Sequence, residues 1–447
     1  FRLLEPVKQY AAQRLERSGQ ATEVRAAHAT YYAAFVAEAA PYTRGPDQME
    51  WERRIDLEYD DVRWAMAYLL EVGEIERYLT VGFDLFVYWM HLALQVEGMS
   101  MLLAGLDGAG EDIDTVARLK AYFVVGSLGA EITDAKAIAH ARHGLELARS
   151  TGDPNLIGRM EWVLGATIGH ATSDPEYEEH LLEAERLLRE HPEPHWWEPD
   201  WEQGLLALNL ASYLPPEGEL TPVRIRRAMT TFEEIGDRAM LAAALDLSTV
   251  LWGQADEDWL VGNNQRAAEI LSEMQVPYWY GHVLLSLGAT QGQRGELVEA
   301  SENLAHGARL LEEMGDLNCW SICVRRRALA ESAMGKGRSA MAGLATVLAA
   351  MPQLPMTELH QPMCLDAAAE ILIADGQLER AAYALGAAKT MTVSKLHPAF
   401  RREPRHEAMQ ATLDSRLGAE ATQTSMDAGT QAGAAEAVAS LARWLDE

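Results

Sequence analysis

The fold is decided by residues 278–316, which read YWYGHVLLSLGATQGQRGELVEASENLAHGARLLEEMGD. Apolar residues recur at helical spacing before and after a turn that contains Gly295, which predicts two antiparallel amphipathic helices. These apolar residues are Val283, Leu284, Leu287, Leu297, Leu304, Leu310 and Leu311. Gly288, Ala289 and Ala300 are small enough to let the two backbones approach closely. One hairpin cannot bury both of its faces, so we expect neighbouring hairpins to stack on it.

The same unit recurs along the chain at a regular spacing. Glycine-aspartate pairs that end one helix and open the next begin at Gly152, Gly236 and Gly315, roughly eighty residues apart, and each interval has a further helix breaker near its middle. The period of roughly forty residues resembles that of tetratricopeptide arrays, with longer helices. We therefore expect an all-α fold, a right-handed superhelical solenoid of tetratricopeptide-like hairpins. The hairpins are expected at residues 113–152, 154–191, 198–236, 238–275, 278–315, 317–352 and 357–391.

Segments near both ends carry residues in a characteristic order. Residues 1–19 read FRLLEPVKQYAAQRLERSG, and residues 45–51 read GPDQMEW. The other segments are His28 with Tyr31 and Tyr32, the LEYDDVRWA of residues 57–65, and the LERAAYALGAAKTM of residues 378–391. Together they resemble the C-terminal helical arm of bacterial STAND regulators, the NB-ARC-type signalling ATPases that include LuxR, AfsR-like and cyclase-linked members. Asp61 and Val62 stand where that family usually has Asn and Leu.

The resemblance implies a division of the chain into four parts. These are a remnant of a winged-helix module at residues 1–20, a helical junction at 21–110, a tetratricopeptide-like repeat array at 111–395 and a C-terminal helical cap at 396–447. Residues 422–433 are poor in apolar residues, so we expect a loop there before a last helix at 434–444. The start at Phe1, in the middle of a pattern, suggests a piece of a longer protein.

The resemblance also implies a function. In STAND regulators the helical arm holds the ATPase inactive until an effector or a protein binds. This chain is therefore expected to sense a small effector or a partner protein in the concave groove of the solenoid and to relieve autoinhibition of a nucleotide-binding module upstream in the same chain. The alternative, from a different class, is a protein-interaction scaffold that binds a basic peptide or partner protein and has no small-molecule effector.

The charge balance limits the partners. The chain has 38 Lys and Arg residues against 67 Asp and Glu residues, a formal net charge of −29. Such an acidic surface repels phosphate backbones, so we expect no direct binding of nucleic acid by this segment. The longest apolar run, residues 81–94, is too short for a bilayer and contains Asp84 and His91, so no membrane insertion is expected. Three cysteines suit a reducing compartment and predict a cytoplasmic location.

Motifs for catalysis and for metal binding are incomplete in this sequence. The GKG of residues 335–337 lacks the spacing and the hydroxyl residue of the phosphate-binding motif GxxxxGK(S/T). Cys319, Cys323, Cys364 and His360 could share a metal ion, but the paired CxxC spacing of zinc sites is missing, and buried packing is the favoured interpretation. We therefore predict that this segment is not an enzyme and has neither a cofactor nor a metal ion.

Aromatic residues gather in the middle hairpins. They are Trp196, Trp197, Trp201, Trp252, Trp259, Tyr278, Trp279, Tyr280 and Trp320. Rings on the inner wall of the solenoid would suit a sugar, a nucleoside-like effector or a peptide, whereas packing between repeats would account for most of them equally well.

The only dense basic run in the array is residues 325–327, three consecutive arginines. Neighbouring positions on a helix point in different directions, so at most two of the three can face inward, and a solvated helix face is the simpler interpretation. The sharper one is that Arg325 or Arg326 pairs with an anionic group, in bidentate fashion if that group is a carboxylate or a phosphate. The predicted ligand-binding residues are Trp252, Tyr280, Trp320, Arg325 and Arg326.

Overall fold

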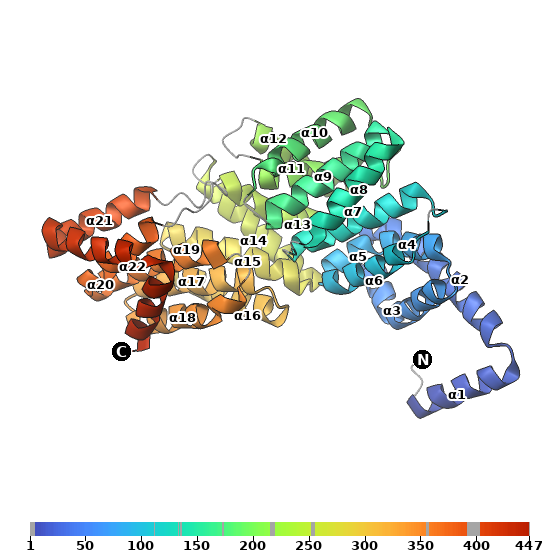
Figure 1. The fold of residues 1–447 in the computed structure, drawn as a ribbon, viewed down its shortest axis with the longest axis horizontal. Coiled ribbons are helices and arrows are strands. Elements are labelled where there is room, and N and C mark those ends of the chain that lie inside the picture. Colours follow the sequence, from blue (N-terminus) through green and yellow to red (C-terminus); the bar gives the residue numbers. More distant parts are fainter. Residues whose placement is uncertain are drawn as a thin grey trace. The chain divides into compact units, whose positions relative to one another are not determined.

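The computed structural model describes the chain except residues 1–4, 111, 133, 135, 172–173, 215–219, 252–254, 355–356, 391–402 and 447. The described residues form helices joined by short connections, and no strand occurs among them, which confirms the predicted all-α class (Figure 1). Residues 1–4 of the expected winged-helix remnant lie outside the described residues. None of the described helices has both the length and the apolar content that crossing a bilayer requires.

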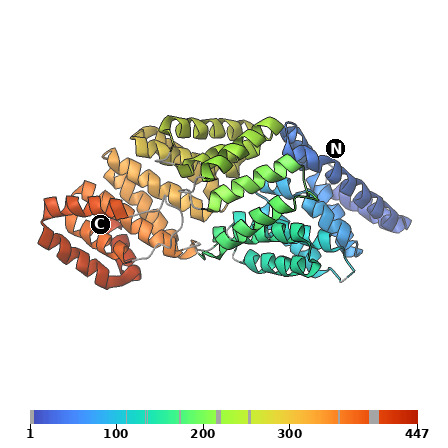
Figure 2. The ribbon, with the colours of Figure 1, turned by 90° about the horizontal axis from the view of Figure 1, so that it is seen from above.

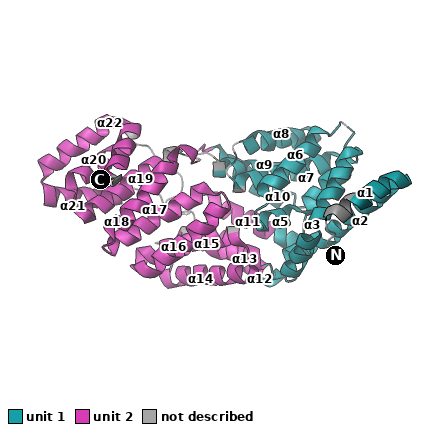
Figure 3. Cartoon of the chain, turned by 90° about the horizontal axis from the view of Figure 1, so that it is seen from below, with its two compact units in different colours: residues 1–171, 176–202, 234–237 teal, residues 172–175, 203–233, 238–447 magenta. Residues whose placement is uncertain are grey.

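The chain forms two compact units, which Figure 3 shows in different colours. Unit 1 comprises residues 1–171, 176–202 and 234–237, and unit 2 comprises residues 172–175, 203–233 and 238–447. The helices of unit 1 are α1 (Glu5–Ser18), α2 (Ala21–Ala39), η1 (Ala40–Arg44), α3 (Gln48–Glu71), α4 (Ile75–Asp84), α5 (Phe86–His91), α6 (Gln95–Asp107), α7 (Thr115–Glu131), α8 (Lys136–Thr151), α9 (Pro154–Ala171) and α10 (Glu176–Glu190). The four-part division at residues 20, 110 and 395 stays a prediction.

Helices α11 (Pro199–Tyr213) and α12 (Leu220–Ile235) contribute residues to both units. The remaining helices belong to unit 2. They are α13 (Arg238–Leu247), η2 (Ser248–Leu251), α14 (Glu257–Met274), α15 (Pro277–Arg294), α16 (Leu297–Glu313), α17 (Leu317–Ala333), α18 (Gly337–Ala350), η3 (Met351–Gln353), α19 (Thr357–Asp375), α20 (Leu378–Lys389), α21 (Glu403–Leu417) and α22 (Ala419–Asp446).

An aromatic cluster fills part of the core of unit 1. The ring of Phe83 stacks on that of Trp197, with centroids 5.0 Å apart and planes 19° apart, and Trp197 contacts Trp201 with centroids 5.4 Å apart. Trp201 is buried and its indole N–H donates a 2.8 Å hydrogen bond to the carboxylate of Asp237. Packing inside unit 1 therefore accounts for Trp197 and Trp201 without a ligand.

Unit 2 is a succession of stacked hairpins. Each helix from α13 to α20 packs against the next one, and α13, α15, α17 and α19 also pack on one another in sequence. The helices from α15 to α18, yellow to orange, lie side by side in both views (Figure 1; Figure 2). This contact between alternate helices is what a solenoid of helical hairpins requires, because each hairpin buries its faces against its neighbours.

In the hairpin of α15 and α16, the two helices approach closely at small residues, as predicted. A Cβ atom on Gly288 of α15 would lie 2.6 Å from Cγ of Leu304 and 3.1 Å from the carbonyl oxygen of Ala300, both on α16. Ala300 is itself fully buried. The turn between the two helices has Gly295 in the left-handed region, at φ 80°, which favours glycine.

The predicted loop at residues 422–433 is wrong. These residues are helical and belong to α22, which continues to Asp446 with a kink at Gly433. The physical reason is that α22 packs on α20 through its backbone and needs almost no apolar side chain there. The two backbones are so close at Gly429 that a Cβ atom would lie 2.0 Å from the carbonyl oxygen of Tyr383 on α20. Thr430 strengthens the same contact by donating a 3.2 Å hydrogen bond to the carbonyl oxygen of Gly386.

Candidate functional site

Four of the five predicted ligand-binding residues lie on two neighbouring helices of unit 2. Tyr280 is on α15 and is half-buried, with its ring edge-to-face against His306 of α16 at 5.4 Å between centroids. Trp320 is on α17, only 6% exposed, and belongs to the hydrophobic core of unit 2. The fifth residue, Trp252, lies outside the described residues.

The two predicted arginines form a cationic cluster with an arginine that the sequence did not suggest. Arg325, which is 4% exposed, and the half-buried Arg326 both come from α17, and Arg405 comes from α21. Burial, together with repulsion from Arg325 and Arg405, lowers the pKa of Arg326 to about 10. Burial also lowers the pKa of Arg325, and Arg405 adds to that effect. The three guanidinium groups are thus close enough to repel one another.

Acidic residues near the cluster already have partners. Arg405 is paired with Glu370 of α19, through a 2.8 Å hydrogen bond from its Nε. Asp366 of α19 accepts a 2.7 Å hydrogen bond from the ring of His406. Within the part of the chain that the structure describes, neither Arg325 nor Arg326 has a hydrogen bond or an ion pair from its guanidinium group.

The third arginine of the run has different surroundings. Arg327 makes a 2.9 Å ion pair with Glu331 one turn further along α17. Arg325 and Arg326 are therefore the members of the run that could bind something else. Two such guanidinium groups suit a carboxylate or a phosphate, because a planar fork of N–H donors matches two anionic oxygens.

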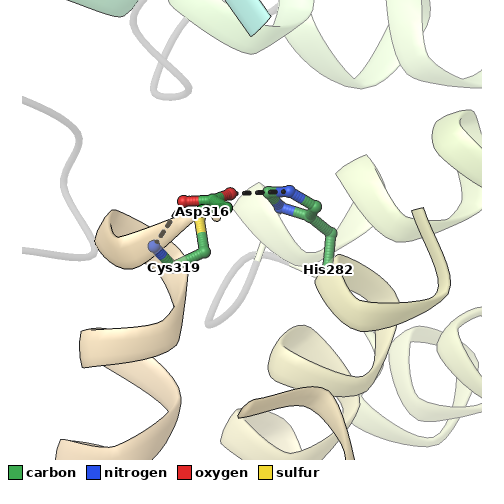
Figure 4. Close-up of side chains that lie close together, drawn as sticks. All are labelled: His282, Asp316 and Cys319. Carbon is green, nitrogen blue, oxygen red and sulfur yellow. Dashed lines mark hydrogen bonds and ion pairs between the residues drawn. The ribbon is translucent and has the colours of Figure 1, made fainter. Parts of the chain in front are cut away.

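A second polar cluster lies at the start of α17 and was missed from the sequence. Figure 4 shows His282 of α15 pointing toward Asp316 and Cys319. His282 Nε2 lies 3.2 Å from Asp316 Oδ2, and Asp316 Oδ1 accepts a 2.9 Å hydrogen bond from the backbone N–H of Cys319. Burial alone would lower the pKa of His282, but Cys319 and Asp316 raise it well above its usual value.

The cysteine set considered from the sequence does not assemble. Cys323 and Cys364 are fully buried, and burial raises the pKa of Cys364 to about 11, so that thiol stays protonated at neutral pH. His360 is held by other groups, with Nδ1 3.0 Å from Ser321 Oγ and Nε2 2.8 Å from Asn318 Oδ1. The interpretation of Cys323 and Cys364 as packing residues fits these surroundings.

The fold and these contacts define an array of stacked tetratricopeptide-like hairpins. No family model matches the chain. A crystal structure with the same fold is that of a STAND protein, a signal transduction ATPase with numerous domains, which has a tetratricopeptide repeat sensor and comes from Pyrococcus horikoshii. The TM-score is 0.51 at 12% sequence identity, over 80% of this chain and 55% of that one. The expected resemblance to the helical arm of STAND proteins is thus confirmed at the level of the fold.

Curated relatives come from mycobacteria. Proteins of Mycobacterium bovis and Mycobacterium tuberculosis that carry the provisional name HTH-type transcriptional regulator are 30% identical to this chain over 182 residues. The match covers 38% of this chain and 20% of each relative, so the chain spans about a fifth of the length of the curated relatives it matches.

Proposed function

We propose that this chain is the sensor arm of a STAND-type signalling regulator in the cytoplasm. The observation that carries the proposal is the fold, a hairpin array like the one in the Pyrococcus horikoshii STAND protein with a tetratricopeptide repeat sensor. The regulator names of the mycobacterial relatives and the STAND-like residue order near both ends of the chain support it. The arm acts on a nucleotide-binding module upstream in the same protein, which belongs to the LuxR, AfsR-like or cyclase-linked kind.

The effector of this proposal is anionic and binds unit 2 at Arg325 and Arg326. A guanidinium held away from water without a direct ion-pair partner destabilises the protein, and Arg325 and Arg326 also repel each other, although Asp366 offsets part of this cost at Arg325. A carboxylate or phosphate group placed between them satisfies both donors and removes the repulsion. Tyr280, Trp320 and Trp252 complete the proposed set: the half-buried ring of Tyr280 would contact the apolar part of the ligand, whereas Trp320 belongs to the core that holds α17 in place.

Relief of autoinhibition requires that the effector binds the active arrangement of the regulator better than the inactive one. Coupling of this kind is reciprocal, so the state of the nucleotide-binding module also changes the affinity of the arm for its effector. The sensor arm itself carries out no chemical step in this proposal.

A thermal-shift comparison tests the effector site. Small carboxylates, phosphates and their neutral analogues are added to the chain, because a ligand that binds only the folded state stabilises it by about 2.7 kcal/mol at a concentration of one hundred times its Kd. We expect anionic compounds to raise the melting temperature and Arg326→Ala to abolish the shift. Arg309→Ala, at an exposed position on α16, removes the same charge and should leave the shift intact.

The net charge of −29 supports the alternative, a scaffold for a basic peptide or protein. Stabilisation by basic peptides alone, equal in the wild type and in the Arg326→Ala variant, would overturn the anionic effector site and favour this scaffold.

A further inference from the structure

The cluster of His282, Asp316 and Cys319 has the composition and the spacing of a metal site. The imidazole nitrogen, the carboxylate oxygen and the thiol sulfur all lie within 4.8 Å of one another. Tetrahedral zinc bonds of about 2.0–2.3 Å place neighbouring ligand atoms about 3.3–3.8 Å apart. The 3.2 Å between His282 Nε2 and Asp316 Oδ2 is already close to that separation, so small side-chain movements would bring all three atoms onto one ion.

The two carboxylate oxygens of Asp316 make different contacts, which suits a metal ligand. Oδ1 caps α17 by accepting the backbone N–H of Cys319, which fixes the carboxylate at the start of the helix. Oδ2 faces His282 and is the oxygen that an ion would bind. Such a hydrogen bond orients the carboxylate before an ion binds. Hydrogen bonds around metal sites generally orient the metal ligands in this way.

The cluster lies close to the surface, although His282 Nε2 itself is covered by protein, so the ring must shift to admit an ion. All three residues are partly exposed, with 31% of the His282 side chain and 16% of the Asp316 side chain exposed. Three protein ligands leave one of the four positions of tetrahedral zinc open for water or for another small ligand, the arrangement of reactive rather than purely structural zinc sites. The mixture of nitrogen, sulfur and oxygen ligands favours zinc-like transition metals over Mg²⁺ and Ca²⁺, which prefer oxygen.

We propose that His282 Nε2, Asp316 Oδ2 and Cys319 Sγ bind one divalent transition metal ion of the zinc type, with an open fourth position. Cys319 binds the ion as a thiolate and His282 binds it as a neutral imidazole, and the protons that these groups lose go to solvent. Because His282 is on α15 and the other two ligands begin α17, the ion joins consecutive hairpins of unit 2. The inference does not depend on the proposed effector, since it concerns the metal alone.

Titration of the metal-free chain with Co²⁺ tests the proposal, because Co²⁺ substitutes for zinc and reports its ligands by absorption. We expect one ion per chain, visible bands of tetrahedral strength and a sulfur-to-cobalt charge-transfer band in the near ultraviolet. Added Zn²⁺ should displace the Co²⁺ and remove these bands. Cys319→Ser should lose the charge-transfer band, and His282→Ala should weaken binding by more than about 10-fold.

Two further variants separate ligation from folding. Asp316→Asn keeps a good helix cap, since Asn caps as well as Asp, but removes the charged ligand, so its metal affinity should fall while its metal-free melting temperature stays near that of the wild type. Cys323→Ala removes a buried thiol one turn further along α17 and should leave the Co²⁺ spectrum unchanged. A wild-type chain without the charge-transfer band, or a band that survives Cys319→Ser, would overturn the site.

Discussion

At the scale of single residues, unit 1 contains a buried ion pair whose charges must be well paired to be stable. Arg159 is fully buried and makes a 2.6 Å ion pair with Glu202, which is 5% exposed. The same guanidinium donates a 2.9 Å hydrogen bond to the carbonyl oxygen of Pro194 and lies over the ring of Trp196, 5.0 Å from its centroid. Pro194 and Trp196 hold the loop after α10 against α9, and Glu202 ties the start of α11 to the same helix.

Replacing one member of this ion pair is predicted to lower the stability of the protein strongly. Replacing both members is predicted to lower it much less. Arg159→Leu leaves the Glu202 carboxylate buried with His195 as its remaining direct partner among the described residues, Nδ1 to Oε2 at 2.9 Å. We expect a loss of about 3–5 kcal/mol in the free energy of unfolding. The double variant Arg159→Leu, Glu202→Leu should recover most of that loss, as measured by urea denaturation. Equal losses in the single and double variants would mean that the ion pair is not the cause.

A buried carboxyl group predicts how stability depends on pH. Burial raises the pKa of Asp84 to about 6, although Lys120 and Arg44 lower it. The unfolded chain, with a carboxyl pKa near 4, loses this proton first, so Asp84 destabilises the fold increasingly as the pH rises from about 4 to about 6. Asp84→Asn should therefore raise the melting temperature above pH 6, by the equivalent of at most about 3 kcal/mol, and change little at pH 4.

The control for that experiment is Asp47→Asn, because the Asp47 side chain is exposed and makes no capping hydrogen bond. Its effect on the melting temperature should be small. A stabilisation by Asp84→Asn that is the same at pH 4 and at pH 8 would contradict the titration argument.

The sequence predicted only part of the candidate sites at this scale, for a physical reason. The arginines at 325 and 326 could be selected because a dense basic run is rare in an acidic chain, and the same run lies in the cluster. Arg405 and the contact of His282 with Asp316 could not be selected, because they depend on how α21 packs on α19 and which turn of α15 lies beside the start of α17. Helical periodicity gives the buried face of each helix, but not the register between two packed helices.

At the scale of the element, the hairpins could be predicted because their ends are marked locally. Gly152, Gly236, Gly295 and Gly315 all have positive φ and end helices at the predicted places. Each of the seven expected hairpins corresponds to one consecutive pair of helices, from α7 with α8 to α19 with α20. The helix at residues 422–433 was not predicted, because it packs through glycine and has few apolar side chains to mark it.

Two helix glycines should therefore respond in opposite ways to the same substitution. In Gly429→Ala the new Cβ would lie 2.0 Å from the carbonyl oxygen of Tyr383, so α22 must move away from α20. We expect a loss of about 1–3 kcal/mol and faster amide exchange in α22. Gly262→Ala on α14 has nothing within 4 Å of the new Cβ and should stabilise the protein by up to about 1 kcal/mol. Equal effects at both positions would contradict the close contact.

At the scale of the whole molecule, the charge distribution separates the two functional proposals. The chain as a whole carries −29, whereas the Arg325 and Arg326 pair is a local cationic site within it. A basic peptide would be attracted by many exposed carboxylates, and an anionic effector would be held by a few buried donors against a repulsive surface. The two modes of binding therefore differ in how salt affects them.

Salt is predicted to weaken the binding of a basic peptide but not the binding of an anion at Arg325 and Arg326. The Debye length falls from about 10 Å at 0.1 M salt to about 3 Å at 1 M, so exposed charges are screened while contacts between buried groups are screened much less. Calorimetric titration of a basic peptide should show affinity falling steeply over this range. A carboxylate or phosphate bound at Arg325 and Arg326 should keep its affinity or gain some, because salt screens the repulsion from the acidic surface while the direct contacts remain. If anionic ligands weaken with salt as steeply as basic peptides do, they bind exposed lysines or arginines instead, and the pair of Arg325 and Arg326 is not the effector site.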